Sequence, residues 1–331
     1  MGKSVTPGEM AALLSRHDGR LVFTTHTGPD GDGAGCALAL AGALKAAGRN
    51  TVCAGLENMP GEYDFLEGLD ENIPAAGYVP LPGDAMVVLD CGAPDRLPEP
   101  LRPHAARLAK FCIDHHRDYS GFAEFALVDE RAAAAAELVM SVIEAGGLPL
   151  ARGTAEALWT GVVTDSGRFS YVATSPETLR RAARLLEAGA CFDRINERVF
   201  NRMELRRFRL RNRLLASFGI SSDGKVAVVS LGPEDYAAES CGYEDSDNFI
   251  DCARVVKGVE ITVFLRKHTP GAPVKISMRT TDRFDAARIC RDEWGGGGHA
   301  RAAGAELDGP LPGIRAVVFA RLRQIAGGTP C

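Results

Sequence analysis

The sequence has no long hydrophobic run. No stretch of its 331 residues approaches the roughly 18 uninterrupted apolar residues that span a bilayer, and segment 1–20 has no apolar core of signal-peptide length. There are nine cysteines but no CxxC pair, and Cys53, Cys91 and Cys112 lie within apolar runs. This usage is typical of reduced core thiols rather than of a disulfide framework or a zinc site. We therefore expect a cytoplasmic protein without membrane association.

A basic excess is also absent. The chain has 38 lysines and arginines against 43 aspartates and glutamates, a formal net charge of -5. Proteins that hold long nucleic acid usually carry a basic excess, because neutralising phosphates dominates their affinity. We therefore do not expect a long duplex as a ligand, although a few cations focused at one site can still bind a small phosphorylated molecule. The 46% of hydrophobic residues is near the average of folded domains.

Short apolar runs alternate with helical segments between Leu21 and Val128. The runs are LVFTTH, TVCAGL, AMVVLDCG, AKFCIDHH and FALVDE, and a long helical segment, GAGCALALAGALKAAG, follows the first of them. This alternation predicts an α/β domain whose parallel, Rossmann-like sheet is flanked by helices. Further helices are expected over 132–145, 154–163 and 175–188. Ligands of such sheets bind beyond the carboxyl ends of the strands, so polar clusters at those ends are candidate site residues.

A charged helical stretch, Ile195–Ala216, precedes a different pattern. From Gly219 the runs KVAVVSL, VEITVFLRK and PVKISMRTT alternate with a period of two, and a closing helix is expected over 311–325. These features predict a smaller mixed sheet with helices. We therefore predict a catalytic domain over 1–195, a helical linker over 196–218 and a second, mixed α/β domain over 219–331.

Metal-binding side chains follow two of the predicted strands. His26, Asp30 and Asp32 lie in the loop THTGPDGDG after the first strand, and Asp90 ends the run AMVVLD. A polar turn with an aspartate helix cap would also explain the loop. Asp90 must be paired, capped or metal-bound, because burying an unpaired carboxylate is expensive, although many such aspartates are structural.

Two further segments carry the same kinds of side chain. The run AKFCI ends in Asp114-His115-His116, and two consecutive histidines after an aspartate are hard to explain by packing. Asp165 follows the helical run EALWTGVV, where its carboxylate opposes the negative end of the helix dipole. A helix end closed by Gly167 is the alternative explanation, but we expect a positive group near Asp165.

Together these segments supply oxygen and imidazole ligands without a thiolate. Such a set suits two divalent metal ions, Mn²⁺ before Mg²⁺, better than a structural zinc. Paired ions about 3.5–4 Å apart commonly catalyse the transfer of phosphoryl groups to water. The predicted ligands are His26, Asp30, Asp32, Asp90, His115 and Asp165.

In order and spacing these four segments resemble the four motifs of the DHH phosphoesterases, whose name derives from the tripeptide found here as Asp114-His115-His116. Segment 294–304, WGGGGHARAAG, resembles the GGGH...AAG signature of the DHHA1 domain. The resemblance spans nearly the whole chain. It points to the NrnA-like oligoribonucleases (nano-RNases) and 3'-phosphoadenosine 5'-phosphate phosphatases, and the second signature argues against the pyrophosphatases of the superfamily.

The resemblance also implies roles for individual residues. Asp90, His116 and Asp114 are the catalytic residues: Asp90 bridges the two ions, His116 contacts the scissile phosphate or its leaving group, and Asp114 orients the histidines beside it. The remaining ligands divide into two groups, His26 with Asp30 for one ion, and Asp32, His115 and Asp165 for the other.

The second domain is implied to bind the substrate, which places the active site in a cleft between the domains. Glycines let backbone amides approach a phosphate or a base closely, and a histidine beside them can donate a hydrogen bond or stack. A glycine-rich turn is the alternative. Arg279 matches a family arginine that can pair with a terminal phosphate, and Thr280 replaces the serine that often follows it. The candidate substrate contacts are His116, Gly296, Gly297, Gly298, His299, Arg279 and Arg266, with Lys275 as a further strand cation.

The resemblance implies a hydrolase in which a water bridging the two ions attacks phosphorus. The expected substrates are oligoribonucleotides of about 2–5 nucleotides, 3'-phosphoadenosine 5'-phosphate, or both, converted to mononucleotides. A linear or cyclic dinucleotide phosphodiesterase is a close alternative. A RecJ-type single-strand exonuclease is disfavoured by the acidic balance and by the lack of an added nucleic-acid-binding domain. A non-catalytic RNA or nucleotide-binding module is disfavoured by the intact ligand set. We also consider a homodimer.

Overall fold

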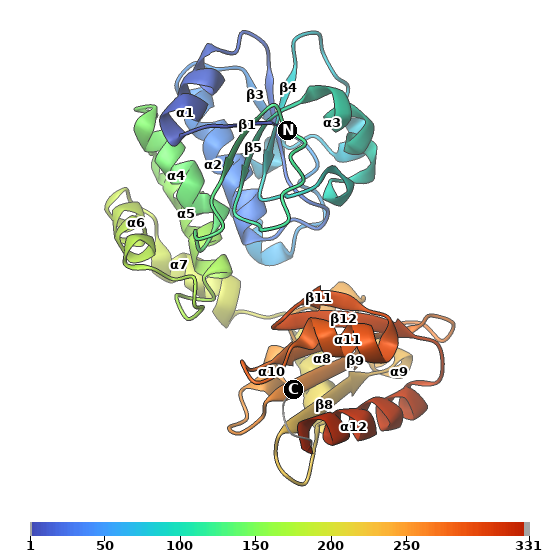
Figure 1. The fold of residues 1–331 in the computed structure, drawn as a ribbon. Coiled ribbons are helices and arrows are strands. Elements are labelled where there is room, and N and C mark those ends of the chain that lie inside the picture. Colours follow the sequence, from blue (N-terminus) through green and yellow to red (C-terminus); the bar gives the residue numbers. More distant parts are fainter. Residues whose placement is uncertain (1, 328–331) are drawn as a thin grey trace. The chain divides into compact units, whose positions relative to one another are not determined.

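The computed structural model describes residues 2–327 of the chain. The chain divides into two compact units, Met1–Arg202 and Met203–Cys331, each built around its own sheet (Figure 1).

The first unit contains a six-stranded sheet in the order β1-β6-β5-β4-β2-β3. All neighbouring strands are parallel, which confirms the predicted Rossmann-like architecture. The edge strand β1 was not predicted, because its two exposed residues have no apolar pattern. The strands are β1 (Lys3–Ser4), β2 (Leu21–Thr24), β3 (Thr51–Cys53), β4 (Ala85–Leu89), β5 (Ala109–Asp114) and β6 (Phe125–Val128).

The central strands of this sheet are buried on both faces. Along β4, Val87 and Leu89 belong to the larger core, whereas Met86 and Val88 belong to a smaller core on the other face. Helices α1, α2, α4 and α5 cover the first face and α3 covers the second (Figure 1). Cys53, Cys91 and Cys112 are buried free thiols, as predicted. The helices are α1 (Pro7–Arg16), α2 (Gly31–Ala46), α3 (Arg102–Leu108), α4 (Ala135–Ala145), α5 (Arg152–Asp165), α6 (Pro176–Glu187) and α7 (Phe192–Asn196).

Helix α2 is buried along nearly its whole length, which explains why its sequence is apolar on all sides. Its glycines bring it close to α5. A Cβ added to Gly35 would lie 2.4 Å from the carbonyl oxygen of Ala157. This close contact fixes the start of α2, with Asp30 and Asp32, against the end of α5, with Asp165.

Two of the predicted helices differ from the structure by more than two residues. Helix α4 begins at Ala135 rather than at Ala132, because the carboxylate of Asp32 caps it there from another part of the chain. The charged stretch Ile195–Ala216 is not one helix: α7 and a π-helical turn (Glu197–Asn201) end before Arg202, and α8 begins at Leu205. This break coincides with the border of the two units, where the chain leaves the core of the first unit.

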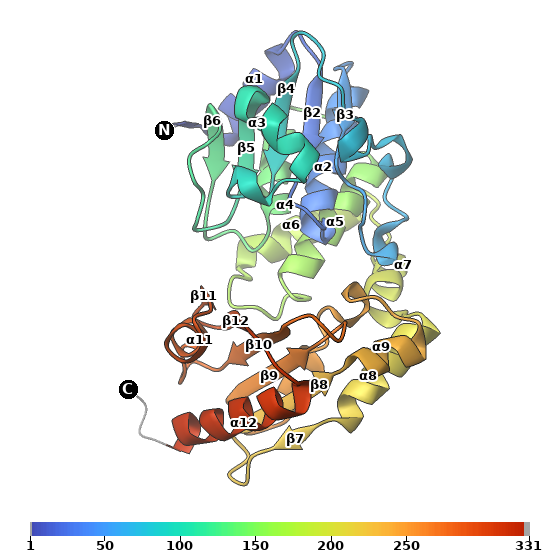
Figure 2. The same cartoon turned by 90° about the vertical axis from the view of Figure 1, so that its right-hand side faces the viewer.

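The second unit contains a mixed six-stranded sheet in the order β11-β12-β10-β9-β8-β7 (Figure 2). Only β8 and β9 are parallel among its pairs within the described residues. Side chains of α11 and α12 pack on one face, and those of α8, α9 and α10 pack on β8 and β9 from the other. The strands are β7 (Gly219–Ile220), β8 (Val226–Leu231), β9 (Ile261–Arg266), β10 (Val274–Thr280), β11 (Gly297–His299) and β12 (Ala302–Leu307). The helices are α8 (Leu205–Ala216), α9 (Pro233–Glu239), α10 (Asp251–Arg254), α11 (Ala286–Trp294) and α12 (Leu311–Gly327).

Candidate metal centre

The candidate ligands meet at the carboxyl edge of the parallel sheet. His26 follows β2, Asp90 follows β4, and His115 and His116 follow β5, and these three strands are neighbours. After β2 the chain forms β3 on one side of that strand and then crosses to form β4 on the other side. The site therefore lies at the topological switch point of the sheet. Open α/β sheets bind their ligands at this point.

The candidate ligands form overlapping groups of three. His26, Asp30 and Asp90 form one, and Asp32, His115 and Asp165 form another; Asp90 also groups with His115 and His116, and within each group the ligand atoms lie within 4.8 Å of one another. The Oδ2 atom of Asp90 lies 3.8 Å from Nε2 of His26, and its Oδ1 atom lies 3.4 Å from Nε2 of His115. The two oxygens of one carboxylate therefore face the two groups.

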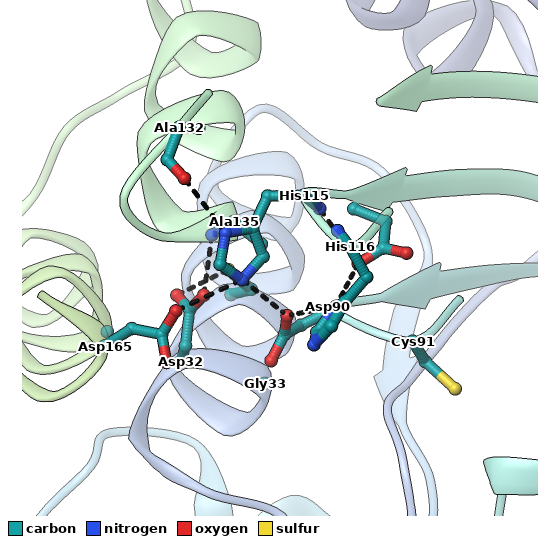
Figure 3. A network of polar contacts seen from close by, with 12 residues as sticks. Asp32, Gly33, Asp90, Cys91, His115, His116, Ala132, Ala135 and Asp165 are labelled. Carbon is teal, nitrogen blue, oxygen red and sulfur yellow. Dashed lines mark hydrogen bonds and ion pairs between the residues drawn. The ribbon is translucent and has the colours of Figure 1, made fainter. Parts of the chain in front are cut away.

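His115 is the centre of the second group (Figure 3). Its Nε2 atom lies 3.1 Å from Oδ2 of Asp165, at the carboxyl end of α5. Its Nδ1 atom lies 3.0 Å from the carbonyl oxygen of Ala132, which can only accept a hydrogen bond. The Nδ1 position must therefore carry the proton, so Nε2 faces the carboxylates with its lone pair whenever the ring is neutral. In His26, a contact of 3.1 Å from Nδ1 to the carbonyl oxygen of Thr27 has the same effect.

Asp30 and Asp32 are also helix caps. Oδ1 of Asp30 accepts hydrogen bonds from the backbone N–H groups of Asp32 (3.1 Å) and Gly33 (3.0 Å) at the start of α2. Asp32 accepts the N–H of Ala135 at 2.6 Å and that of Ala136 at 3.0 Å at the start of α4. The capping and ligand interpretations of this loop are therefore compatible, because each carboxylate has two oxygens and several lone pairs.

The backbone of Asp90 adopts a left-handed conformation with a φ of 49°. Such a conformation is uncommon for a residue with a Cβ and often marks a functional site. It turns the chain sharply at the end of β4. The Oδ1 atom of Asp90 is buried and has no hydrogen bond; it lies 3.4 Å from Nε2 of His115 and 3.4 Å from Nδ1 of His116.

The electrostatics of the site favour a bound cation. Burial and the nearby carboxylates of Asp90 and Asp165 raise the pKa of Asp32 well above its usual value, and burial likewise raises the pKa of Asp90. Burial disfavours the imidazolium of His115, but the carboxylates of Asp165 and Asp90 outweigh that effect and raise its pKa to about 12. A divalent cation would neutralise these carboxylates more completely than a single proton, so the donor set fits metal ions.

His116 differs from His26 and His115. Its Nδ1 atom donates to Oδ1 of Asp114 at 2.8 Å, and the same oxygen accepts the backbone N–H groups of His115 (2.9 Å) and His116 (3.3 Å). The hydrogen bond to Asp114 raises the pKa of His116 above its usual value. Fully buried Asp114 therefore holds His116 in a fixed orientation in which its protonated form is favoured.

Three of the candidate substrate contacts of the second unit, Arg279, His299 and Gly297, lie on one sheet face. Arg279 is opposite Ala302 on β12, and Ala302 is opposite His299 on β11, so the three residues form one row across the sheet. Directly opposite residues of neighbouring strands share a face of the sheet. Because β12 lies between β10 and β11, the backbones of Arg279 and His299 are about 10 Å apart. Gly297 lies on the same face, two residues from His299 along β11, whereas Gly296 and Gly298 lie at alternate positions.

Arg266 differs from the exposed strand cation expected from the sequence. Its residue surface is only 9% exposed, and its Nη1 atom donates to Asp247 at 2.8 Å. The guanidinium carbon of Arg266 lies over the rings of Phe264, on the same strand, and of Tyr243, which comes from another segment and carried no sequence signal.

Two further contributors to the metal centre escaped the sequence analysis. Gly161 on α5 lies against Asp32: a Cβ added there would be 2.5 Å from Oδ1 of Asp32 and 2.8 Å from Cβ of Ala136. The carbonyl oxygen of Ala132 orients His115. For Gly161, the only sequence signal was the spacing of glycines within α5. The carbonyl oxygen of Ala132 is a backbone atom and therefore gave no sequence signal.

No helix within residues 2–327 is both long and apolar enough to traverse a membrane. The profile of the DHH family, N-terminal domain, matches residues 20–162, and that of the DHHA1 domain matches residues 223–324. The chain is 35% identical, over 91% of its length and 88% of the relative's, to the bifunctional oligoribonuclease and PAP phosphatase NrnA of Thermus thermophilus. It is 23% identical to the protein of the same name from Bacillus subtilis, over 90% and 92% of the two chains.

A solved structure shares the fold. An exopolyphosphatase-related protein from Bacteroides fragilis superposes with a TM-score of 0.87 over 96% of both chains, at 24% identity. The two family profiles and the Thermus thermophilus relative show that this chain belongs to the DHH/DHHA1 phosphoesterase family.

Proposed function

We propose that this protein hydrolyses short oligoribonucleotides of about 2–5 nucleotides to mononucleotides and removes a phosphate from 3'-phosphoadenosine 5'-phosphate, with two divalent metal ions as cofactors. Two relatives named bifunctional oligoribonuclease and PAP phosphatase support the substrates. The observation that carries the proposal is the position of Asp90, whose two oxygens face two separate ligand groups. A carboxylate with this geometry suits a pair of ions rather than a single one.

The side chains divide into two ligand sets. His26 and Asp30 would hold one ion, and Asp32, His115 and Asp165 would hold the other, with Asp90 shared between them. A pair of divalent ions lowers the pKa of water and neutralises charge on the phosphoryl group. We propose Mn²⁺ before Mg²⁺, because the imidazole nitrogens of His26 and His115 lie among the oxygens, and imidazole ligands suit the softer ion.

His116 is the proposed contact to the scissile phosphate. Its Nδ1 atom is engaged by Asp114, so its other ring nitrogen is the one available to donate to a phosphate oxygen. A fixed, protonated donor stabilises negative charge that develops during phosphoryl transfer. Asp114 positions this donor and does not itself touch the substrate in this proposal.

The proposed substrate-binding surface is the open face of the second sheet, by which we mean the part over β10, β12 and β11 that lies opposite α11 and α12 and beyond the helices packed on β8 and β9. Arg279 has no carboxylate partner among the described residues; its Nη1 donates only to the carbonyl oxygen of Met278, so its guanidinium can pair with a terminal phosphate. His299 and Gly297 lie in the same part of that face. Both residues are exposed, as contacts to a transient ligand need to be. The homodimer and the cytoplasmic location stay predictions.

The first experiment follows mononucleotide release from a 5'-labelled RNA dinucleotide and from an RNA of about 24 nucleotides. Each substrate is incubated with Mn²⁺, with Mg²⁺ and with a chelator. We expect Mn²⁺-dependent turnover that favours the dinucleotide and stops with the chelator.

The other outcomes separate the alternatives. Comparable cleavage of the long RNA would favour a RecJ-type exonuclease. If both RNAs survive, 3'-phosphoadenosine 5'-phosphate and linear dinucleotides derived from cyclic dinucleotides are tested next. Survival of all these substrates would favour a non-catalytic nucleotide-binding module and contradict the proposed hydrolysis.

A further inference from the structure

The open face of the second sheet extends beyond the row that contains Arg279. Along β10, Val274, Ile276 and Met278 are buried in the core beneath α11 and α12. The alternate residues Lys275 and Arg279 therefore point to the opposite face. They are four residues apart, which is about 13 Å along a strand. A second cation thus lies on the substrate-binding face at a distance from the first.

Lys275 belongs to a cluster of cations around one aromatic ring. It lies directly opposite Arg266 on β9. The guanidinium carbon of Arg266 lies 4.4 Å from the ring centroid of Tyr243, and the Nζ atom of Lys275 lies 5.7 Å from the same centroid. Contacts of this length are cation–π interactions. We call Arg266, Lys275 and Tyr243 the distal basic cluster.

The surroundings of the cluster hold it in place. Ser246 Oγ lies 2.8 Å from the hydroxyl of buried Tyr236 and accepts a hydrogen bond from Nη1 of Arg266 at 3.3 Å. The ring of His268 packs edge-on against both tyrosines, with a centroid distance of 4.9 Å to Tyr236 and 6.2 Å to Tyr243. An arginine held in this way loses little conformational entropy when it binds a ligand.

The cluster has more hydrogen-bond donors than acceptors. The Nε atom of Arg266 and the hydroxyl of Tyr243 are both buried and have no hydrogen-bond partner in the structure. Asp247 is the only carboxylate within ion-pair distance of Arg266 among residues 2–327, and none lies within that distance of Lys275. Unsatisfied buried donors are costly, so they indicate a missing acceptor. A phosphate group supplies several strong acceptor oxygens with negative charge.

We propose that the distal basic cluster binds a second phosphate of the longer oligoribonucleotides, while the row of Arg279 and His299 binds the first. This inference rests on the proposed function and adds a length preference to it. The separation of about 13 Å along β10 exceeds the reach of a single nucleotide, so a dinucleotide engages the cluster less completely than a pentanucleotide does.

The test compares Lys275→Gln with Lys257→Gln, which removes an equivalent charge from an exposed loop lysine. Turnover of an RNA pentanucleotide and of a dinucleotide is measured with Mn²⁺ at several salt concentrations. For Lys275→Gln we expect the ratio of kcat/KM, pentanucleotide over dinucleotide, to fall about tenfold, chiefly through KM, with a weaker salt dependence. Lys257→Gln should keep the wild-type ratio. Arg266→Lys, which retains charge but loses the planar fork, should lower the ratio as well.

Binding of a fluorescent pentanucleotide in the presence of a chelator tests the cluster independently of hydrolysis. If the wild-type protein binds the pentanucleotide but hydrolyses nothing, the proposed function fails while the cluster can still be tested. An equal loss on both substrates, accompanied by a lower melting temperature, would mean that the cluster only stabilises the fold. That result, or an unchanged ratio in Lys275→Gln, would overturn the inference.

Discussion

The carboxylate of Asp32 lies 2.6 Å from the backbone nitrogen of Ala135 and caps helix α4 across 103 residues of sequence. The same carboxylate is a candidate metal ligand. One side chain therefore links the candidate metal centre to the start of a core helix. A substitution that keeps the helix cap but removes the charge can separate capping from metal binding.

Asp32→Asn and Asp32→Ala provide that separation. Both variants remove the charge, but asparagine retains an oxygen that can accept a helix N–H. Loss of a cap costs about 1 kcal/mol, which corresponds to about 2–4 °C in a domain of this size. We expect both variants to lose metal-dependent turnover and Asp32→Ala to melt at a lower temperature than Asp32→Asn in chelator. Equal melting temperatures would contradict the capping role.

Asp90→Asn tests the bridging carboxylate. Loss of a residue that hydrogen-bonds to a metal ligand lowers activity by up to about 100-fold. We expect kcat of Asp90→Asn to fall further than this, because both proposed ion positions lose a ligand. In the wild type, Mn²⁺ at about 100 times its Kd should stabilise the fold by about 2.7 kcal/mol, and Asp90→Asn should remove most of this shift. Asp95→Asn, at an exposed position near Asp90 in the chain, is the control for both measurements.

Gly161→Ala tests the close packing of α5 against Asp32. The new Cβ would lie 2.5 Å from Oδ1 of Asp32, so the carboxylate or the helix must shift. We expect a loss of about 1–3 kcal/mol of stability and weaker Mn²⁺ binding by calorimetry. Gly42→Ala is a matched control on α2, because its Cβ would meet only the hydroxyl of Thr154, at 3.9 Å. It should be neutral or stabilise by about 0.5–1 kcal/mol, since alanine is the better helix former.

The opposite edge of the first sheet gives a pH-dependent prediction. Asp84 accepts hydrogen bonds from Arg20 Nη2 (2.7 Å) and Tyr78 Oη (2.7 Å). Burial disfavours its charge, but the bonds to Arg20 outweigh that effect and lower the pKa of Asp84. Its contribution to stability is therefore present above the unfolded value of about 3.9 and lost as the pH falls through the folded pKa. Asp84→Asn should cost about 1–3 kcal/mol at neutral pH.

Urea unfolding of Asp84→Asn and of the wild type at pH 7 and near pH 3 would measure this dependence. The difference in unfolding free energy should shrink at the lower pH. A constant difference would mean that the charge of Asp84 makes no contribution.

His299→Ala tests the substrate-binding face. Because His299 is exposed on the edge strand β11 and is not one of the candidate metal ligands, we expect KM for the dinucleotide to rise about tenfold with little change in kcat. Steady-state kinetics with Mn²⁺ separate the two parameters. A fall in kcat alone would instead assign His299 a part in the chemical step.

The parallel sheet, and the edge at which the candidate ligands meet, could be predicted from the sequence because both depend on local patterns. Apolar strands covered on both faces appear as continuous apolar runs, and a parallel sheet brings their carboxyl ends together. His26, Asp90 and His115 therefore meet in the structure at the predicted edge. Their individual catalytic roles stay predictions.

The contacts that escaped prediction are those made across long sequence distances. The start of α4 depends on Asp32, and Arg266 is covered by Tyr243 from outside its strand. The break between α7 and α8 depends on where one hydrophobic core ends, which helix propensity does not encode. Helical periodicity alone could not distinguish this stretch from a continuous helix.

Strand β10 places its apolar residues in the core and its cations on the open face by simple alternation. A one-residue insertion within this strand would reverse the alternation on one side of the inserted residue, so that cations on that side would point inward and apolar residues outward. The number of residues in β10 is therefore constrained as well as their identity, and substitutions test only the identity. In a library of single-residue insertions, β10 should be intolerant along its length, whereas the neighbouring turn over residues 268–272 should accept extra residues.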